Sequence, residues 1–344
     1  MFLSKILAAS SFLFSKGESW REWLVSKLDL VDALPELHNE HVKIEEETLQ
    51  WSVDFKLIKE GTKGYLKSQA AQFSKLCSYA LKDAPKEHVK VVSELVAWLF
   101  ERDDKLDQKE EDLGDKPDQV RMLDERNLQI LRGTLEPESA SEKALKDLRD
   151  KAYKANPDLV TLVAKFRDYF QANWLEAERR DQHKKGIDIS KLASVSSYYE
   201  FRIFTSAVQV YYELASIVLK DPLTDEDKEN VVIQKLSNTS AYIIGVHNDL
   251  FSLGKELEED YAENLVLIEM RENNLTLKEA LNKVIANVNK LISEYKALRD
   301  DFLRKPMNSK FREYIERMDK LIDGNVIFSS KSERYKIIPK ELLL

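Results

Sequence analysis

Long segments in which apolar residues recur at helical intervals are the feature that most constrains the fold of this chain. The longest of them cover residues 86–108, 226–258 and 275–303. Gly and Pro, which shape turns and interrupt regular elements, number only 9 and 8 among 344 residues. Apolar positions spaced three and four residues apart mark the buried face of an α-helix. The sequence therefore predicts an all-α fold rather than a sheet of many short strands.

Breaks rich in Gly, Pro and charged residues divide the rest of the chain into further helices. The predicted helices cover residues 39–58, 61–81, 86–108, 120–131, 142–155, 157–180, 226–258, 275–303 and 311–322. The Ser- and Thr-containing stretch 197–206 argues against a single regular helix between residues 189 and 219. Neither a repeat nor a long linker divides the chain. We expect a single-domain helical bundle at residues 36–344, with an N-terminal extension at 1–35 and a C-terminal flap from residue 324.

Charge and cysteine content exclude several classes of function. The net charge is −8, from 53 basic and 61 acidic residues, and no basic block stands out. Nucleic acid is therefore not an expected partner. Cys77 is the only cysteine, which rules out an intrachain disulfide and is compatible with a cytoplasmic location. Because no apolar stretch approaches about 20 residues, we expect no membrane span.

The segment 248–256, with the sequence NDLFSLGKE, carries the most informative pattern of polar residues. Asn248, Ser252 and Glu256 are spaced four residues apart, so on a helix they share one face. An amide, a hydroxyl and a carboxylate are hard oxygen donors that suit Mg²⁺ when a phosphate-bearing substrate supplies further ligands. An irregular turn or a buried hydrogen bond would equally place Asn and Ser in this apolar segment.

A second acidic segment, DDKLD at residues 103–107, ends the strongly apolar helix predicted at 86–108. Asp103 and Asp107 are four residues apart and face the same way, with Asp104 about a quarter-turn away. In a chain with 61 acidic residues, this spacing alone favours a solvated helix end over a metal site. The interpretation as a metal site depends on pairing this segment with Asn248, Ser252 and Glu256.

Taken together, these segments resemble the motifs of class I terpene synthases. DDKLD is similar to the aspartate-rich motif of that family, and NDLFSLGKE to its second metal-binding triad. Arg202 lies 46 residues before Asn248, where the family has a diphosphate-sensing arginine. Arg334 and Tyr335 begin 86 residues after Asn248, where the family has an Arg-Tyr pair. The resemblance covers residues 39–335.

The resemblance implies a Mg²⁺-dependent enzyme, with about three ions bound together with the substrate diphosphate. The implied metal ligands are Asp103, Asp104, Asp107, Asn248, Ser252 and Glu256. Arg202, Arg334 and Tyr335 would contact the diphosphate. Thr205 and Ser206 stand at the positions of the linker and effector that follow the sensing arginine, without the usual acidic linker, and Phe328 stands where the family often has tryptophan.

The implied reaction is ionisation of a linear prenyl diphosphate, followed by cyclisation of the carbocation and release of diphosphate. Such a cation needs a dry, aromatic pocket. Candidate aromatics near the motifs are Phe73, Trp98, Phe100, Trp174, Tyr199, Phe201 and Phe251. Farnesyl diphosphate is the favoured substrate, with geranylgeranyl diphosphate close behind, and the protein is expected to be a monomer or homodimer. The alternatives are a chain-elongating prenyltransferase and a non-catalytic helical interaction protein.

Overall fold

The computed structural model describes residues 19–107, 113–157, 159, 161–187, 193–257, 263–337 and 339. All regular elements within these ranges are helical, which confirms the predicted all-α fold. The α-helices are α2 (Trp20–Lys27), α3 (His41–Asp54), α4 (Lys63–Ala71), α5 (Ser74–Ala80), α6 (Lys86–Asp107), α7 (Pro117–Arg132), α8 (Ala140–Ala155), α9 (Leu162–Lys184), α10 (Val195–Thr205), α11 (Val208–Ala215), α12 (Asp225–Lys228), α13 (Val231–Glu256), α14 (Leu265–Glu272), α15 (Leu277–Leu303) and α16 (Arg312–Lys331). Short 3₁₀ helices are η2 (Ser216–Val218), η3 (Pro306–Phe311) and η4 (Glu333–Tyr335).

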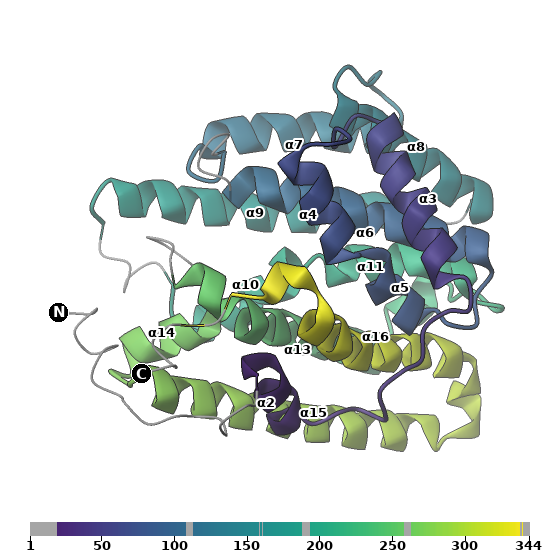
Figure 1. Cartoon of the computed structure of the whole chain (residues 1–344). Coiled ribbons are helices and arrows are strands. Elements are labelled where there is room, and N and C mark those ends of the chain that lie inside the picture. The colour runs from purple at the N-terminus through teal and green to yellow at the C-terminus, as the bar shows by residue number, and fades with distance from the viewer. Residues whose placement is uncertain are drawn as a thin grey trace.

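The helices form a bundle in which α13 is a central member. It packs against α10, α11, α14, α15 and α16 (Figure 1). On the other side of the bundle, α6 contacts α3, α5, α8 and α11, while α9 contacts α7, α10 and α11. The 3₁₀ helix η4 contacts α13, and its residue Arg334 contacts Asp103 near the C-terminal end of α6. Three segments that are far apart in the sequence therefore lie side by side.

The central helix α13 has a defined start and a mostly buried surface. The side chain of its N-cap, Asn230, accepts hydrogen bonds from the backbone N–H groups of Val232 and Ile233. Further along, Ile243 and Leu250 are fully buried. Because this helix is held on several sides, the polar side chains of its last turns are presented from a fixed backbone.

A break between α10 and α11 confirms that the segment 189–219 is not one regular helix. α10 begins at a capping box in which the Ser194 hydroxyl accepts from the Ser197 backbone N–H. It ends at Thr205, and Ala207 adopts a left-handed conformation with φ of 57° before α11 starts at Val208. The chain thus changes direction one turn after Arg202.

Several predicted helix limits were wrong, and local conformation accounts for one of the largest errors. The helix predicted at 61–81 is two helices, because Gln72 adopts φ of 54° and caps α4. The break places Phe73 against Phe100, with ring centroids 4.2 Å apart. The helix predicted from Pro157 begins only at Leu162.

The C-terminal prediction also needs correction. α16 continues through Gly324 to Lys331, so the helix does not end at residue 322 and the segment from 324 is not a flap over its first eight positions. Gly324 lies in the helix where an added Cβ would be only 3.0 Å from Tyr79 Cβ, so the residue allows close packing rather than a turn. The short helix α14 was not predicted.

The N-terminal extension contributes to the core where it is described. Trp20, Trp23 and Leu24 of α2 are buried, and α2 packs on α13 and α16. The Arg21 guanidinium also donates to the Ser332 backbone carbonyl at 2.8 Å. Residues 1–18 lie outside the described part. No helix among the described residues has the length and apolar character needed to span a membrane.

Candidate active site

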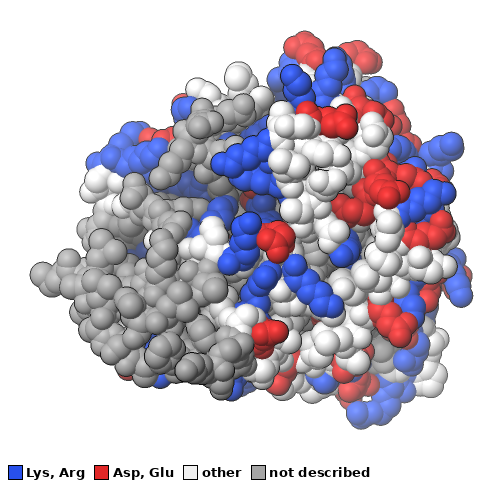
Figure 2. All heavy atoms as spheres, in the orientation of Figure 1, with Lys and Arg blue, Asp and Glu red and all other residues white. Residues whose placement is uncertain are grey.

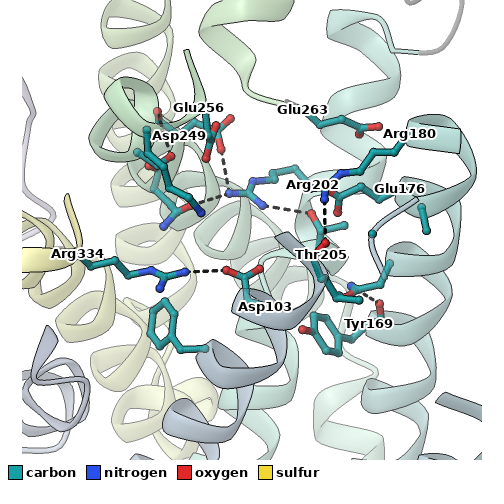
Figure 3. Close-up of a pocket in the computed structure, with 18 of the residues that line it drawn as sticks. Asp103, Tyr169, Glu176, Arg180, Arg202, Thr205, Asp249, Glu256, Glu263 and Arg334 are labelled. Carbon is teal, nitrogen blue, oxygen red and sulfur yellow. Dashed lines mark hydrogen bonds and ion pairs between the residues drawn. The ribbon is translucent and has the colours of Figure 1, made fainter. Parts of the chain in front are cut away.

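Eight of the eleven predicted site residues line one pocket between α6, α9, α10, α13 and η4 (Figure 3). We call it the polar pocket. Its lining includes Asp103, Arg202, Thr205, Asn248, Ser252, Glu256, Arg334 and Tyr335. Ser206 lines a neighbouring apolar pocket, and Asp104 lines an outer cleft next to Arg334. Asp107 is the last residue of α6, and its side chain lies outside what the structure describes.

The three polar residues of α13 share a face, as predicted, and each already has a hydrogen-bond partner. The Asn248 amide nitrogen donates to the Tyr335 hydroxyl at 2.8 Å. The Ser252 hydroxyl donates to the Asn248 backbone carbonyl at 2.8 Å, which leaves its oxygen lone pairs available. The Glu256 carboxylate accepts from the Asn264 side chain at 2.8 Å. These contacts orient an amide oxygen, a hydroxyl and a carboxylate along one stripe.

Arg202 connects α10 to α13. Its Nη2 donates to Asp249 Oδ1 at 2.8 Å, to Asn248 Oδ1 at 3.0 Å and to the Gly245 carbonyl at 3.2 Å. Its Nη1 donates to Thr205 Oγ1 at 3.3 Å. The sensing arginine and the linker position named by the resemblance are therefore in direct contact, with a hydroxyl at that position instead of a carboxylate.

Arg334 connects η4 to the end of α6. One guanidinium nitrogen donates to Asp103 Oδ2 and the other to Asp104 Oδ1, both at 2.8 Å. The guanidinium also lies over the Phe100 ring, 4.7 Å from its centroid. Through this fork Arg334 contacts both Asp103 and Asp104, which lie a quarter-turn apart on α6.

Asp249 and Asn264 take part in the hydrogen bonds that join α14 to the end of α13. The Asp249 carboxylate accepts from the Tyr198 hydroxyl and from the Leu265 backbone N–H, the latter at 2.7 Å. The side chain of Asn264, which caps α14, donates to the Asp249 carbonyl as well as to Glu256. α14 is thereby fixed to the last two turns of α13, where the polar stripe lies.

Glu256 is a carboxyl group of the polar pocket that lies near a second negative charge, Asp249. Burial raises the pKa of Glu256, and the negative charge of Asp249 raises it further, while the hydrogen bond from Asn264 opposes this rise. In the described part of the chain, no three His, Cys, Asp or Glu side chains group closely enough to hold a metal by themselves. One carboxylate, one amide and one hydroxyl facing Asp103 do fit Mg²⁺ if a substrate provides the remaining oxygens.

The apolar pocket opens from the polar one. The residues that line both are Phe100, Asp103, Tyr169, Arg202, Thr205, Asn248 and Tyr335. Leu76, Val96, Leu99, Ile244 and Leu321 supply apolar walls beyond them. A charged head group and a hydrocarbon chain of one molecule could therefore occupy adjoining spaces.

Only part of this lining was predicted. Of the seven candidate aromatics, Phe100 lines the apolar pocket; Trp98 is buried in the core, where its indole nitrogen donates to Ser141, and Tyr199 is 42% exposed. Tyr169 and Tyr211, which line the pocket, were missed. Four polar or charged residues that line the polar pocket were also missed: Asn173, Glu176, Arg180 and Glu263. Helical periodicity predicts that Asn173, Glu176 and Arg180 share one face of α9. It does not predict that this face packs against α10.

Comparison with known proteins agrees with this architecture. A family model described as terpene synthase family 2, C-terminal metal binding, matches residues 94–294. The (+)-eremophilene synthase of Sorangium cellulosum is 27% identical over 295 residues, covering 85% of this chain and 87% of that protein. The (+)-T-muurolol synthase of Roseiflexus castenholzii, named as (2E,6E)-farnesyl diphosphate cyclizing, is 26% identical, covering 85% and 88%.

A solved structure shows the same fold. The crystal structure of germacradien-4-ol synthase from Streptomyces citricolor superposes with a TM-score of 0.73 at 20% identity, covering 88% of this chain and 99% of that one. The fold and the paired motifs define a class I terpene synthase, an enzyme that cyclises a prenyl diphosphate. The chain belongs to the terpene synthase family 2.

Proposed function

We propose that this terpene synthase binds Mg²⁺ and farnesyl diphosphate, ionises the substrate in the polar pocket and cyclises the carbocation in the apolar pocket. The convergence of Asp103, Asn248, Ser252, Glu256, Arg202 and Arg334 on one pocket is the observation that carries the proposal. Diphosphate leaves readily only if its developing negative charge is stabilised, and this pocket concentrates the groups that do so.

The metal ligands are assigned to the two acidic segments. Asp103 on α6, and Asn248, Ser252 and Glu256 on α13, would hold Mg²⁺, with Asp104 and Asp107 as further carboxylates of the α6 segment. When bound, Mg²⁺ supplies positive charge to the diphosphate leaving group. The contact of Asn264 with Glu256 keeps that carboxylate on the ligand stripe.

The two arginines would exchange partners when substrate binds. Arg202 is now paired with Asp249 and bonded to Asn248, and Arg334 is paired with Asp103 and Asp104. With Asp103 and Asp104 engaged as metal ligands, Arg334 would be free to turn to phosphate oxygens, and both guanidinium groups could offer them two parallel hydrogen bonds. Tyr335 provides one further donor, and motion of Arg202 acts on Thr205, next to Ser206 at the helix break.

The choice of farnesyl diphosphate follows the relatives. The T-muurolol synthase named above carries that substrate in its name and matches this chain along most of its length. Geranylgeranyl diphosphate is the second candidate. Phe100, Tyr169 and Tyr211 lie along the pocket where a cation would form, and aromatic faces stabilise cations by up to about 2 kcal/mol each when water is excluded.

The test is product analysis with a defined set of substrates. Purified protein is incubated with C10, C15 and C20 diphosphates, each with Mg²⁺ and with EDTA, and extracts are analysed by gas chromatography with mass spectrometry. We expect a Mg²⁺-dependent cyclic product from the C15 substrate. Product from only the C20 substrate would correct the chain length, and metal-independent turnover would refute the metal assignment. Longer prenyl chains formed after adding isopentenyl diphosphate would indicate an elongating enzyme instead.

A further inference from the structure

An outer cleft next to the polar pocket is lined by an excess of positive charge and by exposed apolar side chains. It encloses about 540 Å³ between α4 and η4. The residues that line it are Lys63, Leu66, Lys67, Ser68, Ala70, Ala71, Phe73, Asp104, Lys255, Glu333, Arg334, Lys336 and Ile337. We call it the basic cleft. It shares Lys255 and Arg334 with the polar pocket, so the two spaces adjoin.

Positive charge is concentrated in this cleft although the protein as a whole is acidic. Five of the lining residues are Lys or Arg and two are Asp or Glu, in a chain of net charge −8. Two of the cations are already matched, because Arg334 pairs with Asp104 at 2.8 Å and Lys336 lies 3.5 Å from Glu333. Basic side chains gather round a hollow on this face of the molecule (Figure 2).

Lys63 and Lys67 contribute charge that local structure does not explain. They are four residues apart on α4 and face the cleft together, an arrangement that disfavours a helix by roughly 0.2–0.5 kcal/mol. Neither makes an ion pair within the described ranges, whereas the neighbouring Ser68 donates to Glu101 at 2.6 Å. A like-charged pair aimed into a cleft is suited to a polyvalent anion.

The same cleft exposes large apolar side chains. Leu66 is 57% exposed and Ile337 is 37% exposed, and both lie among the lysines. An inorganic anion would not need them, and leaving them in water costs about 25 cal/mol for each Å² of apolar area. A molecule with a diphosphate head and a hydrocarbon tail would use both kinds of surface.

We infer that the basic cleft is an outer binding site for the prenyl diphosphate, which the molecule occupies before it passes Lys255 and Arg334 into the polar pocket. This inference rests on the proposed function. Lys63, Lys67 and Lys336 attract the head group, and Leu66 and Ile337 hold part of the tail. Charged clefts of this kind raise association rates by about 10- to 1,000-fold, an effect that salt weakens.

Kinetics with matched charge variants test the inference. The double variant Lys63→Glu/Lys67→Glu is compared with Lys143→Glu/Lys290→Glu, which makes the same change in net charge at exposed positions of α8 and α15 outside the cleft. We expect kcat/KM of the cleft variant to fall about tenfold at low salt while kcat changes less than about twofold, and the difference to shrink as salt is raised. Equal losses in both variants would overturn the inference.

A binding measurement separates this inference from the proposed function. Farnesyl S-thiolodiphosphate, which resists ionisation, is titrated calorimetrically into the full chain in EDTA, with inorganic diphosphate titrated in parallel. We expect the thiolodiphosphate to bind more tightly than inorganic diphosphate, and to bind at least about fivefold more weakly to the cleft variant than to the control. Equal affinity for the two probes would overturn the assignment to a prenyl diphosphate. Binding without turnover would refute only the proposed function.

Discussion

At the scale of single residues, the site is a set of opposite charges held in mutual contact until a substrate arrives. Arg202 reaches Asp249 and Arg334 reaches Asp103 and Asp104, each at 2.8 Å. Such pairs keep the guanidinium forks oriented, and they offset part of the cost of burying charge. Glu256 differs from them, because the hydrogen bond that it accepts comes from the neutral Asn264 side chain. Glu256 is therefore the carboxylate of α13 whose negative charge a bound metal ion would stabilise most.

Replacing Glu256 by Gln tests that role. The amide keeps the shape and the contact with Asn264, but it lacks the charge that holds a divalent cation. We expect turnover to fall at least about 100-fold, equivalent to about 2.7 kcal/mol, with an unchanged circular dichroism spectrum. Glu294→Gln, at an exposed position of α15, is the control. Normal turnover of the Glu256 variant at saturating Mg²⁺ would remove the residue from the metal site.

Gly245 positions the arginine through its missing side chain. An added Cβ would lie 2.8 Å from Arg202 Cγ and 3.1 Å from its Nε, so the arginine stem lies directly against α13 at this point. Gly245→Ala would displace that stem from Asn248 and Asp249. We expect a loss of at least about tenfold in kcat, because orientation of a catalytic group by an ångström matters at this level. Gly64→Ala on α4, where a Cβ would meet only Thr62 at 3.8 Å, should retain wild-type kcat.

At the scale of elements, sequence periodicity predicted which residues share a face of one helix. It did not predict the contacts between helices. The shared face of Asn248, Ser252 and Glu256 was predicted from their spacing, because all three belong to α13. Spacing did not predict the hydrogen bonds from Asn264 to Asp249 and Glu256, since these require α14 to fold back onto the last turns of α13. Glu176 and Arg180 enter the pocket only through the packing of α9. Helix ends at Gln72 and Ala207 depend on left-handed residues that are neither Gly nor Asn, so composition gave no signal for them.

The break at Ala207 has a measurable energetic signature. A left-handed conformation costs an alanine roughly 1–2 kcal/mol and costs glycine little, although glycine loses more backbone entropy on folding. We therefore expect Ala207→Gly to raise the free energy of unfolding by up to about 1 kcal/mol in urea denaturation. Ala286→Gly, at an exposed right-handed position of α15, should lower it by about 1 kcal/mol. Destabilisation by both substitutions would show that the side chain of Ala207 contributes more than its conformation costs.

At the scale of the whole molecule, the bundle is built around helices that carry both the core and the site. One side of α13 binds Arg202, and the opposite side carries core residues such as His247 and Leu250, which are fully buried. The first described helix, α2, packs onto the same bundle through Trp20 and through the contact of Arg21 with Ser332, two residues before Arg334. Global stability and the geometry of the site are therefore linked through α13 and η4.

His247 makes that stability depend on pH. Its ring is completely buried, and neither ring nitrogen has a hydrogen-bond partner among the residues described. Burial lowers the pKa of His247 from 6.5 to about 3. The folded state therefore keeps the ring neutral between those values while the unfolded chain takes up a proton, so stability falls as pH drops below 6.5. The slope is about 1.4 kcal/mol per pH unit, or about 2 kcal/mol between pH 7 and pH 5.

Comparison of wild type with His247→Leu isolates this contribution. Free energies of unfolding are measured in EDTA at pH 7 and pH 5, so that metal binding does not enter. We expect the wild type to lose about 2 kcal/mol more than the variant over that interval, because only the wild type gains a proton on unfolding. Above pH 6.5 the two curves should run parallel, since the ring is then neutral in both states. Two results would contradict this expectation: curves that stay parallel down to pH 5, or a His247 ring signal in nuclear magnetic resonance that titrates in the folded protein over that range. Either result would show that solvent reaches the ring. The region of α13 around His247 would then be less tightly enclosed than its packing indicates.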